Sequence, residues 1–286
     1  MKIGIDNYSY HRYFGEVYPR QKAPGIRWGL DEFLDQMREK HKDAEGFSLE
    51  TCFITANERK SLLQRLEKID KEVMFAWGHP NGFMDIPAND AICEVNEFIE
   101  LSAKLGFDRM RIAASSITYL NKPHEPQIDQ AIKCIRSIIP VAAHYNVKLG
   151  LENHGDFYLH EMLKILEEID SPYLGVTFDT GNSLRMNEDH LDSIKAYGEK
   201  LIAVHAKDIG PEKDVPKDHI GYWNCVTAGQ GVTDFAAVFR ALDEIRFDGM
   251  VLLEISRLHS DYEHLDEAEV LEEGLQYLRK VREQVK

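Results

Sequence analysis

The feature that most constrains the fold of this chain is a short apolar segment that runs into a carboxylate or an imidazole. It occurs four times in the second half of the sequence, at Glu152, Asp179, His205 and Glu254. A charged side chain cannot lie unpaired in a protein core, so each needs a cation, hydrogen bonds or water. The separations of 27, 26 and 49 residues are too long for neighbours on one helix. They fit parallel strands that stand side by side and bring their ends into one ring.

Apolar runs typical of strands alternate with amphipathic segments typical of helices along the whole chain. The predicted strands lie at about residues 2–6, 47–52, 72–77, 109–114, 147–152, 174–179, 201–206 and 250–255. The predicted helices lie at about residues 28–42, 57–69, 90–105, 128–146, 158–169, 190–200, 234–245 and 265–285. Eight strands, each followed by a helix, predict an α/β fold, a (β/α)₈ TIM barrel formed by residues 1–286 as a single domain. The sequence has no glycine-rich dinucleotide-binding motif after the first strand and no P-loop, so a nucleotide-binding fold has no support.

Three local features carry expectations of their own. Asn57 is expected to be the N-cap of the second helix. Pro140 lies inside the predicted helix 128–146 and is expected to kink it or divide it in two. The connections at 7–27 and 208–232 are long, carry aromatic residues and follow strands. They should therefore lie on the C-terminal face of the barrel, either as a lid over a small ligand or as ordinary surface loops.

Composition and charge exclude several classes of protein. No apolar run approaches the roughly 18 residues that a membrane span requires. The segment Met1–Asp6 resembles a strand and not a signal peptide, and the four cysteines are scattered without a close pair, so a cytoplasmic location is expected. The formal charge of −15 disfavours binding to a nucleic acid backbone.

The four polar strand ends supply three carboxylates and one imidazole. Such an oxygen-rich set suits Mn²⁺ best, with Mg²⁺, Co²⁺ or Zn²⁺ as alternatives. A single glutamate at a strand end is more often a salt-bridge partner, and a single buried histidine is usually a hydrogen-bonded core residue. The combination on four successive strands favours one divalent metal ion.

Several short motifs resemble those of the xylose-isomerase-like TIM barrels, a group that includes ketose 3-epimerases, hydroxypyruvate isomerase and inosose dehydratase. The resemblance covers essentially the whole chain and is specific for the fold and the metal site, but not for the substrate. The motifs that carry it are Leu-Glu-Asn-His at 151–154, Phe-Asp-Thr-Gly-Asn at 178–182, His-Ala-Lys-Asp at 205–208, Leu-Leu-Glu at 252–254 and Gly-Gln-Gly-Val-Thr-Asp-Phe at 229–235.

The resemblance implies roles for individual residues. Glu152, Asp179, His205 and Glu254 would hold one metal ion, and in the epimerase branch the residues matching Glu152 and Glu254 also exchange the proton beside the ketone. In the dehydratase branch, a histidine matching His154 is the base, although His154 could instead orient one of the metal ligands. Epimerases often carry a histidine three residues after the aspartate ligand, where this chain has Asn182.

Candidate substrate-binding residues surround these ligands in the predicted barrel. Lys207 should point to the same side of its strand as His205 and could bind a substrate oxygen, or form an ion pair with Asp208 or Glu254. Arg111 and Arg257 are candidate anion anchors, with surface salt bridges as the alternative. The full set of candidate substrate contacts is Lys207, Asn182, Glu50, His79 and Arg257.

The leading prediction is a divalent-metal-dependent isomerase or epimerase of a small keto-sugar or sugar derivative, acting through an enediolate. A metal ion that chelates a carbonyl and a neighbouring hydroxyl acidifies the adjacent C–H, and two carboxylates could then move the proton. The alternative is a lyase, a decarboxylase or dehydratase of a 3-oxo sugar acid or related keto-polyol. A DNA repair endonuclease is disfavoured by the acidic charge. The expected partner is a small carbohydrate substrate, and no binding to nucleic acid or membrane is expected. The sequence leaves open whether the protein forms a homo-oligomer.

Overall fold

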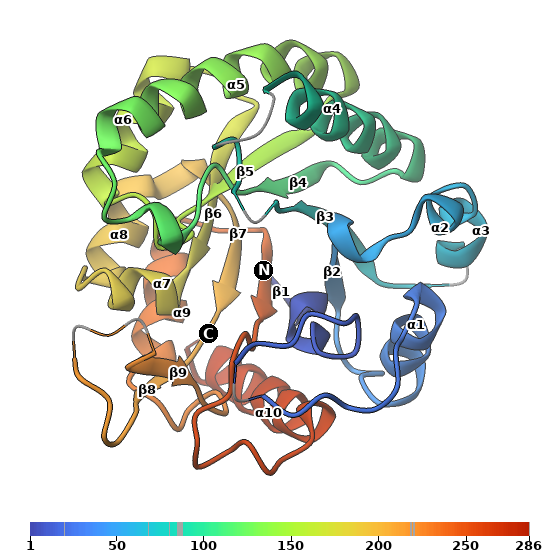
Figure 1. The fold of residues 1–286 in the computed structure, drawn as a ribbon, viewed down its shortest axis with the longest axis vertical. Helices are drawn as coiled ribbons and strands as arrows, with labels where there is room; N and C mark the ends of the chain where they lie inside the picture. Colours follow the sequence, from blue (N-terminus) through green and yellow to red (C-terminus); the bar gives the residue numbers. More distant parts are fainter. Residues whose placement is uncertain are drawn as a thin grey trace.

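A closed barrel of parallel strands forms the centre of the computed structural model, and helices surround it (Figure 1). The structure describes residues 1–286 except 20, 68, 80, 85–87, 218, 220 and 286. The barrel order is β1-β10-β7-β6-β5-β4-β3-β2, which confirms the predicted TIM barrel. Its strands are β1 (Lys2–Asp6), β2 (Gly46–Glu50), β3 (Glu72–Trp77), β4 (Arg109–Ile112), β5 (Lys148–Glu152), β6 (Leu174–Asp179), β7 (Leu201–Ala206) and β10 (Met250–Leu253).

The barrel interior changes from apolar to polar along its axis because alternate residues of each strand point inward. A small cluster of Met74, Ala203, Met250 and Leu252 fills part of the interior. His205 lies two residues after Ala203 on β7, and Glu254 lies two residues after Leu252. These polar residues therefore form the next layer, toward the C-terminal ends of the strands.

The helices cover the outside of the barrel with their apolar faces. Phe75 of β3, for example, packs edge-to-face against Phe98 of α4, with ring centroids 5.2 Å apart. The helix α10 packs on β1, β10 and α9. The helices are α1 (Leu30–Glu39), α2 (Ala56–Arg59), α3 (Leu62–Leu66), α4 (Ala88–Leu105), α5 (His124–Tyr145), α6 (Leu159–Ile169), α7 (Thr180–Arg185), α8 (His190–Tyr197), α9 (Phe235–Glu244) and α10 (Glu267–Val285).

The region predicted as one helix from Asn57 to residue 69 differs from the prediction. It forms two short helices, and the N-cap of α2 is Thr55, whose side chain accepts a hydrogen bond from the backbone N–H of Glu58. The Glu58 carboxylate in turn accepts from the Thr55 N–H. This reciprocal capping box satisfies two free N–H groups and outweighs the single cap that Asn57 would provide.

The predicted helix 128–146 is not divided at Pro140, because α5 is one helix from His124 to Tyr145. A kink at Pro140 stays a prediction. Pro140 is exposed, as is Arg136 one turn earlier. The ring removes one helical hydrogen bond, and the Arg136 carbonyl that loses its partner belongs to an exposed residue on the outer face of the helix. The tertiary contacts of α5 with α4 and α6 hold the helix together across this defect.

The two long connections lie after strands β1 and β7, as predicted. The first begins with a 3₁₀ turn at Asn7–Tyr10. The second contains an antiparallel pair, β8 (Ile209–Pro211) and β9 (Trp223–Cys225), beside the barrel (Figure 1). Among the described helices, none is both long and apolar enough to cross a bilayer.

Candidate metal centre

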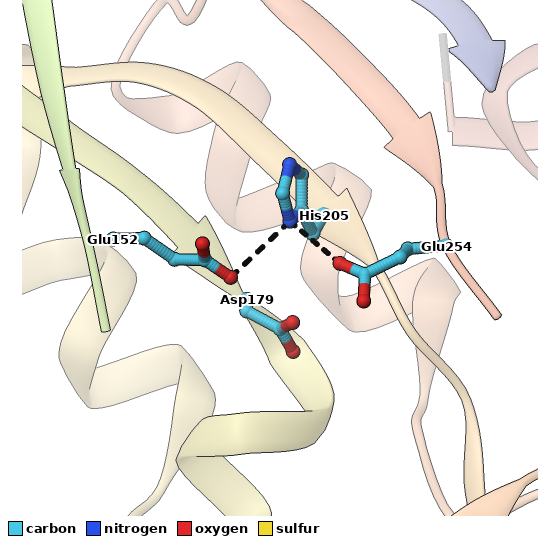
Figure 2. A group of neighbouring side chains, drawn as sticks. All are labelled: Glu152, Asp179, His205 and Glu254. Carbon is cyan, nitrogen blue, oxygen red and sulfur yellow. Dashed lines mark ion pairs between the residues drawn. The ribbon is translucent and has the colours of Figure 1, made fainter. Parts of the chain in front are cut away.

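Four side chains from the C-terminal ends of neighbouring strands meet in one cluster, which we call the ligand cluster: Glu152, Asp179, His205 and Glu254. Each offers one ligand atom, and these atoms all lie within 4.8 Å of one another. All four residues are buried. Figure 2 shows Glu152 and Glu254 on opposite sides of His205, with Asp179 beside them. The prediction that these strand ends converge is met by this geometry, and their role as metal ligands stays a prediction.

Strand register brings these residues to one level of the barrel. Asp179 of β6 pairs with His205 of β7, and His205 pairs with Leu252 of β10, two residues before Glu254. Two hydrogen bonds made by the Asn153 side chain connect the ends of β5 and β6. Its side-chain amide donates to the Asp179 carbonyl at 3.0 Å and accepts from the Asp179 N–H at 2.7 Å.

The imidazole of His205 lies between three carboxylates. Its Nδ1 is 2.7 Å from a Glu254 oxygen and 3.4 Å from a Glu152 oxygen, and its Nε2 is 3.4 Å from Asp6 Oδ2. The Asp6 carboxylate is itself held by the Tyr8 N–H and the Ser48 hydroxyl. A proton on Nε2 is therefore stabilised by Asp6, which leaves the Nδ1 lone pair for a ligand in the cluster.

Two buried cations neutralise part of the negative charge. The Lys207 ammonium lies 2.6 Å from Asp179 Oδ2 and 2.7 Å from Glu254 Oε1. The Arg111 guanidinium contacts both Glu50 and Glu152. The ion pair between Lys207 and Glu254, one of the alternatives for Lys207, is thus present, and its contact with a substrate stays a prediction. The surface salt bridge considered for Arg111 is wrong, because this residue is 5% exposed and its partners are buried carboxylates.

The pKa values follow from burial and from these pairs. Burial alone would raise the pKa of Glu254, but Lys207 and His205 hold it below its ordinary value. Burial alone would lower the pKa of His205, and Glu152 and Glu254 raise it well above its ordinary value. The pKa of Asp179 is raised by burial and by neighbouring carboxylates, which outweigh Lys207. An imidazole must be neutral to bind a metal ion, so loading an ion would release a proton here.

The cluster fits a divalent metal ion. Four atoms of the cluster are buried without a hydrogen-bond partner among the described residues, although charged groups lie close to them: both ring nitrogens of His205, Oδ2 of Asp179 and Oε2 of Glu152. Polar atoms that are close but not aligned with one another are what a shared ligand would satisfy. Three carboxylates and one imidazole are a donor set for Mn²⁺, Mg²⁺, Co²⁺ or Zn²⁺.

The other sequence-predicted residues have local partners. Asn182 is buried at the start of α7, where its N–H donates to Asp179 and its side-chain oxygen accepts from Arg185. His154 is half-buried, with Nδ1 3.0 Å from the Ser115 carbonyl. Their places beside the cluster are compatible with substrate contact, which stays a prediction.

Three further candidates lie at different depths. Glu50 is buried and bonded to Arg111. The Nδ1 atom of His79 accepts a hydrogen bond from the Asn81 N–H. Arg257 is half-buried, and its guanidinium lies against Gly221 in the connection after β8.

Sequence reasoning missed Asp6. The same signal that identified Asp179, an apolar strand that ends in an aspartate, is present in Ile3-Gly4-Ile5-Asp6 and could have found it. Its partner His205 lies 199 residues further along the chain, and only closure of the barrel brings β1 near β7 on either side of β10.

The chain belongs to the xylose isomerase-like TIM barrel family, whose model matches residues 30–281. This match includes all four residues of the ligand cluster and confirms the resemblance inferred from the motifs. It covers every barrel strand except β1.

Curated relatives match over shorter stretches. The chain is 28% identical over 119 residues to a 3-oxo-isoapionate decarboxylase of Pectobacterium atrosepticum, covering 42% of this chain and 43% of the relative. It is 27% identical over 122 residues to an inosose dehydratase of Geobacillus thermodenitrificans, covering 40% of this chain and 39% of the relative. The match thus spans less than half the length of either relative.

Solved structures match over nearly the whole chain at low identity. The IOLI protein with a bound zinc atom superposes with a TM-score of 0.77 at 18% identity, covering 100% of this chain and 99% of that one. A D-psicose 3-epimerase superposes with a TM-score of 0.73 at 14% identity, also covering 100% and 99%. A 3-keto-D-glucoside 4-epimerase from E. coli gives a TM-score of 0.72 at 17% identity, covering 98% and 99%. At such identities the likeness establishes the fold.

Proposed function

We propose that the protein is a divalent-metal-dependent isomerase or epimerase of a small keto-sugar or sugar derivative. The observation that carries this proposal is the ligand cluster itself, in which two glutamates flank a potential metal site inside a barrel of the xylose isomerase-like family. A site that only bound sugar would not require two carboxylates on opposite sides of His205 (Figure 2).

The roles of the residues follow from their places. Glu152, Asp179, His205 and Glu254 would hold the ion. When bound, the ion would act as a Lewis acid on a substrate carbonyl and make the neighbouring C–H more acidic. Mn²⁺ is the proposed ion because carboxylates dominate the donor set, and Zn²⁺ is the alternative, supported by the relative that binds zinc.

The two glutamates would handle the proton. They project from β5 and from the residue after β10, so they approach the space beside His205 from two directions (Figure 2). One could remove a proton from one face of a carbon and the other could return it to the opposite face, through an enediolate of the substrate. Lys207, which already contacts Glu254, would stabilise negative charge on a substrate oxygen.

A lyase is the second candidate. It is favoured by the curated relatives, which include a decarboxylase and several dehydratases, and by His154 beside the cluster, where a base could act. Loss of water or CO₂ from a 3-oxo sugar acid would use the same enediolate.

The half-buried Arg185, which is bonded to Asn182, adds positive charge near the cluster and would suit an acid substrate.

One experiment separates these candidates. The protein loaded with Mn²⁺ is incubated in D₂O with a panel of ketoses and 3-oxo sugar acids, and the products are analysed by mass spectrometry and NMR. An isomerase or epimerase places deuterium on a carbon of a recovered sugar with the same carbon skeleton. A lyase releases water or CO₂ instead. A protein that binds no divalent ion, or binds one without any exchange or release across the panel, would contradict the proposal.

A further inference from the structure

Arg111 contacts three oxygen atoms with three different nitrogen atoms. Its Nε lies 3.0 Å from Glu152 Oε2, and its Nη1 donates to the Trp77 carbonyl at 3.1 Å. Its Nη2 donates to Glu50 Oε1. A guanidinium is planar, so two hydrogen bonds and one ion-pair contact in different directions restrict both its position and its orientation.

The two oxygens of the Glu152 carboxylate have different neighbours. Oε2 is the oxygen that faces Arg111, while Oε1 is the oxygen that lies 3.4 Å from Nδ1 of His205. Glu152 therefore presents one oxygen to the ligand cluster and keeps the other on the far side. A carboxylate without such a partner would be free to rotate and to offer both oxygens to an ion.

The backbone around Arg111 leaves room for this arrangement. A Cβ atom at Gly78 would lie 2.9 Å from Nη1 of Arg111 and 3.4 Å from Oε2 of Glu50. Any side chain at this position would push against the guanidinium. The backbone of Glu50 is anchored as well, since its N–H donates to the Asn7 side-chain oxygen at 2.7 Å. Gly78 and the Glu50 carboxylate therefore limit where the guanidinium can lie, and neither belongs to the ligand cluster.

We infer that Arg111 is a positioning residue that makes Glu152 a one-oxygen ligand and sets the geometry of the metal centre. This inference rests on the proposed metal-dependent function. The competing explanation is that Arg111 only balances the charge of two buried carboxylates and stabilises the fold. The two explanations differ in what happens when charge balance is kept but the guanidinium is lost.

The double variant R111M/E50Q tests this difference, because it removes one positive and one negative charge together. Binding of Mn²⁺ is measured by isothermal titration calorimetry, and the visible absorption spectrum is recorded with Co²⁺. If Arg111 positions Glu152, Mn²⁺ affinity falls by about 10- to 100-fold, as is typical for loss of a group that orients a metal ligand. The Co²⁺ spectrum also changes, because the coordination of Glu152 changes.

The variant R109M is the matched control. Arg109 lies two residues earlier on β4, where its Nη1 donates to the Ile202 carbonyl and its Nε pairs with Asp108. R109M removes an arginine from the same strand without touching Glu152. It should keep the wild-type affinity for Mn²⁺ and the wild-type Co²⁺ spectrum even if it lowers the melting temperature.

Two single variants test the same role of Arg111 if the double variant does not fold. R111K keeps the charge, but one ammonium cannot reach all three partners, and G78A pushes on the guanidinium without changing any charge. Each should weaken Mn²⁺ binding and alter the Co²⁺ spectrum. Wild-type affinity and spectrum in the folded variants would overturn the role of Arg111. Failure of the wild-type protein to bind Mn²⁺ or Co²⁺ would instead overturn the proposed function.

Discussion

At the scale of single residues, the chemistry depends on how each buried charge is paired. Glu254 is in contact with both His205 and Lys207. Asp179 caps α7 with one oxygen and meets Lys207 with the other. Glu152 is paired with Arg111. Each carboxylate of the cluster therefore has a partner that restricts its rotation, and a metal ion would find its ligands already oriented.

The substitution E254Q tests the central residue. Glutamine keeps the shape but removes the charge, so it should weaken Mn²⁺ binding and lower kcat by about 10²- to 10⁴-fold, the range for loss of an acid or base. Binding is measured by calorimetry and turnover on the substrate found in the D₂O screen.

Its control is E45Q. Glu45 lies just before β2, where it accepts from the Ile3 N–H and pairs with Arg282. This variant should keep both Mn²⁺ affinity and kcat. Undiminished turnover in E254Q would remove Glu254 from the proton transfer, and undiminished metal affinity would remove it from the ligand set.

At the scale of elements, helix ends and helix contacts show where single-residue rules fail. The capping box at Thr55 and the continuous α5 both arise from interactions that a single-residue rule does not weigh. In each case a hydrogen bond or a packing contact next to the residue decides the outcome.

The substitution P140A should stabilise the protein. Alanine restores the N–H that can donate to the Arg136 carbonyl, and it is a far better helix former than proline. Because proline also restricts the unfolded chain, we expect a net gain of about 1 to 3 kcal/mol in the free energy of unfolding. Urea denaturation measures it, and K133A, at an exposed site of the same helix, should change stability by less than about 0.5 kcal/mol. A loss of stability in P140A would show that α5 depends on the proline.

A histidine links α5 to α6 and should make stability depend on pH. His124 Nδ1 lies 2.8 Å from Glu161, which accepts a hydrogen bond from the Tyr158 N–H at the start of α6, and its Nε2 lies 2.8 Å from the Leu120 carbonyl. Burial opposes the charge, but these two acceptors raise the pKa of His124 above its ordinary value of 6.5. The charged form is thus favoured in the folded state.

The sign of this effect follows from linkage. The stabilisation by His124 is fully present below pH 6.5 and is lost as the pH rises through the raised pKa. The variant H124Q should therefore show a smaller fall in unfolding free energy across this window than the wild type, measured by urea denaturation at a series of pH values. H144Q, at an exposed site of the same helix, should keep the wild-type slope. Equal slopes in H124Q and wild type would contradict the expectation.

At the scale of the whole molecule, the barrel concentrates negative charge in its interior. Among the described residues around the mouth, the buried carboxylates outnumber the buried cations even when His205 is protonated: Asp6, Glu50, Glu152, Asp179 and Glu254 face Arg111, Lys207 and His205. Such an excess is unfavourable in a low-dielectric interior, and a divalent ion would reduce it. Ion binding and folding should therefore be coupled.

Metal loading should raise the stability of the protein. With Mn²⁺ at about 1,000 times its dissociation constant, the free energy of unfolding should rise by about 4 kcal/mol. Thermal denaturation with and without EDTA measures this, and the variant D179N should gain much less from Mn²⁺. Identical melting temperatures for the wild type in Mn²⁺ and in EDTA would argue against an ion in the cluster.

The fold and the four residues of the ligand cluster could be predicted from the sequence alone. The alternation of strands and helices identified the barrel because each element carries its own periodicity. The strand-end residues Glu152, Asp179, His205 and Glu254 were found because an acidic or imidazole side chain after an apolar run is conspicuous. Each of these patterns involves only a few neighbouring residues, so it can be recognised without knowing the tertiary structure.

The pairing of buried charges was decided only by the tertiary structure. Arg111 meets Glu50 and Glu152, and Asp6 meets His205, across separations of 61, 41 and 199 residues. Which side chains face each other depends on strand register and on closure of β1 against β10. Neither is encoded in a stretch of a few residues, because both result from packing the whole barrel at once.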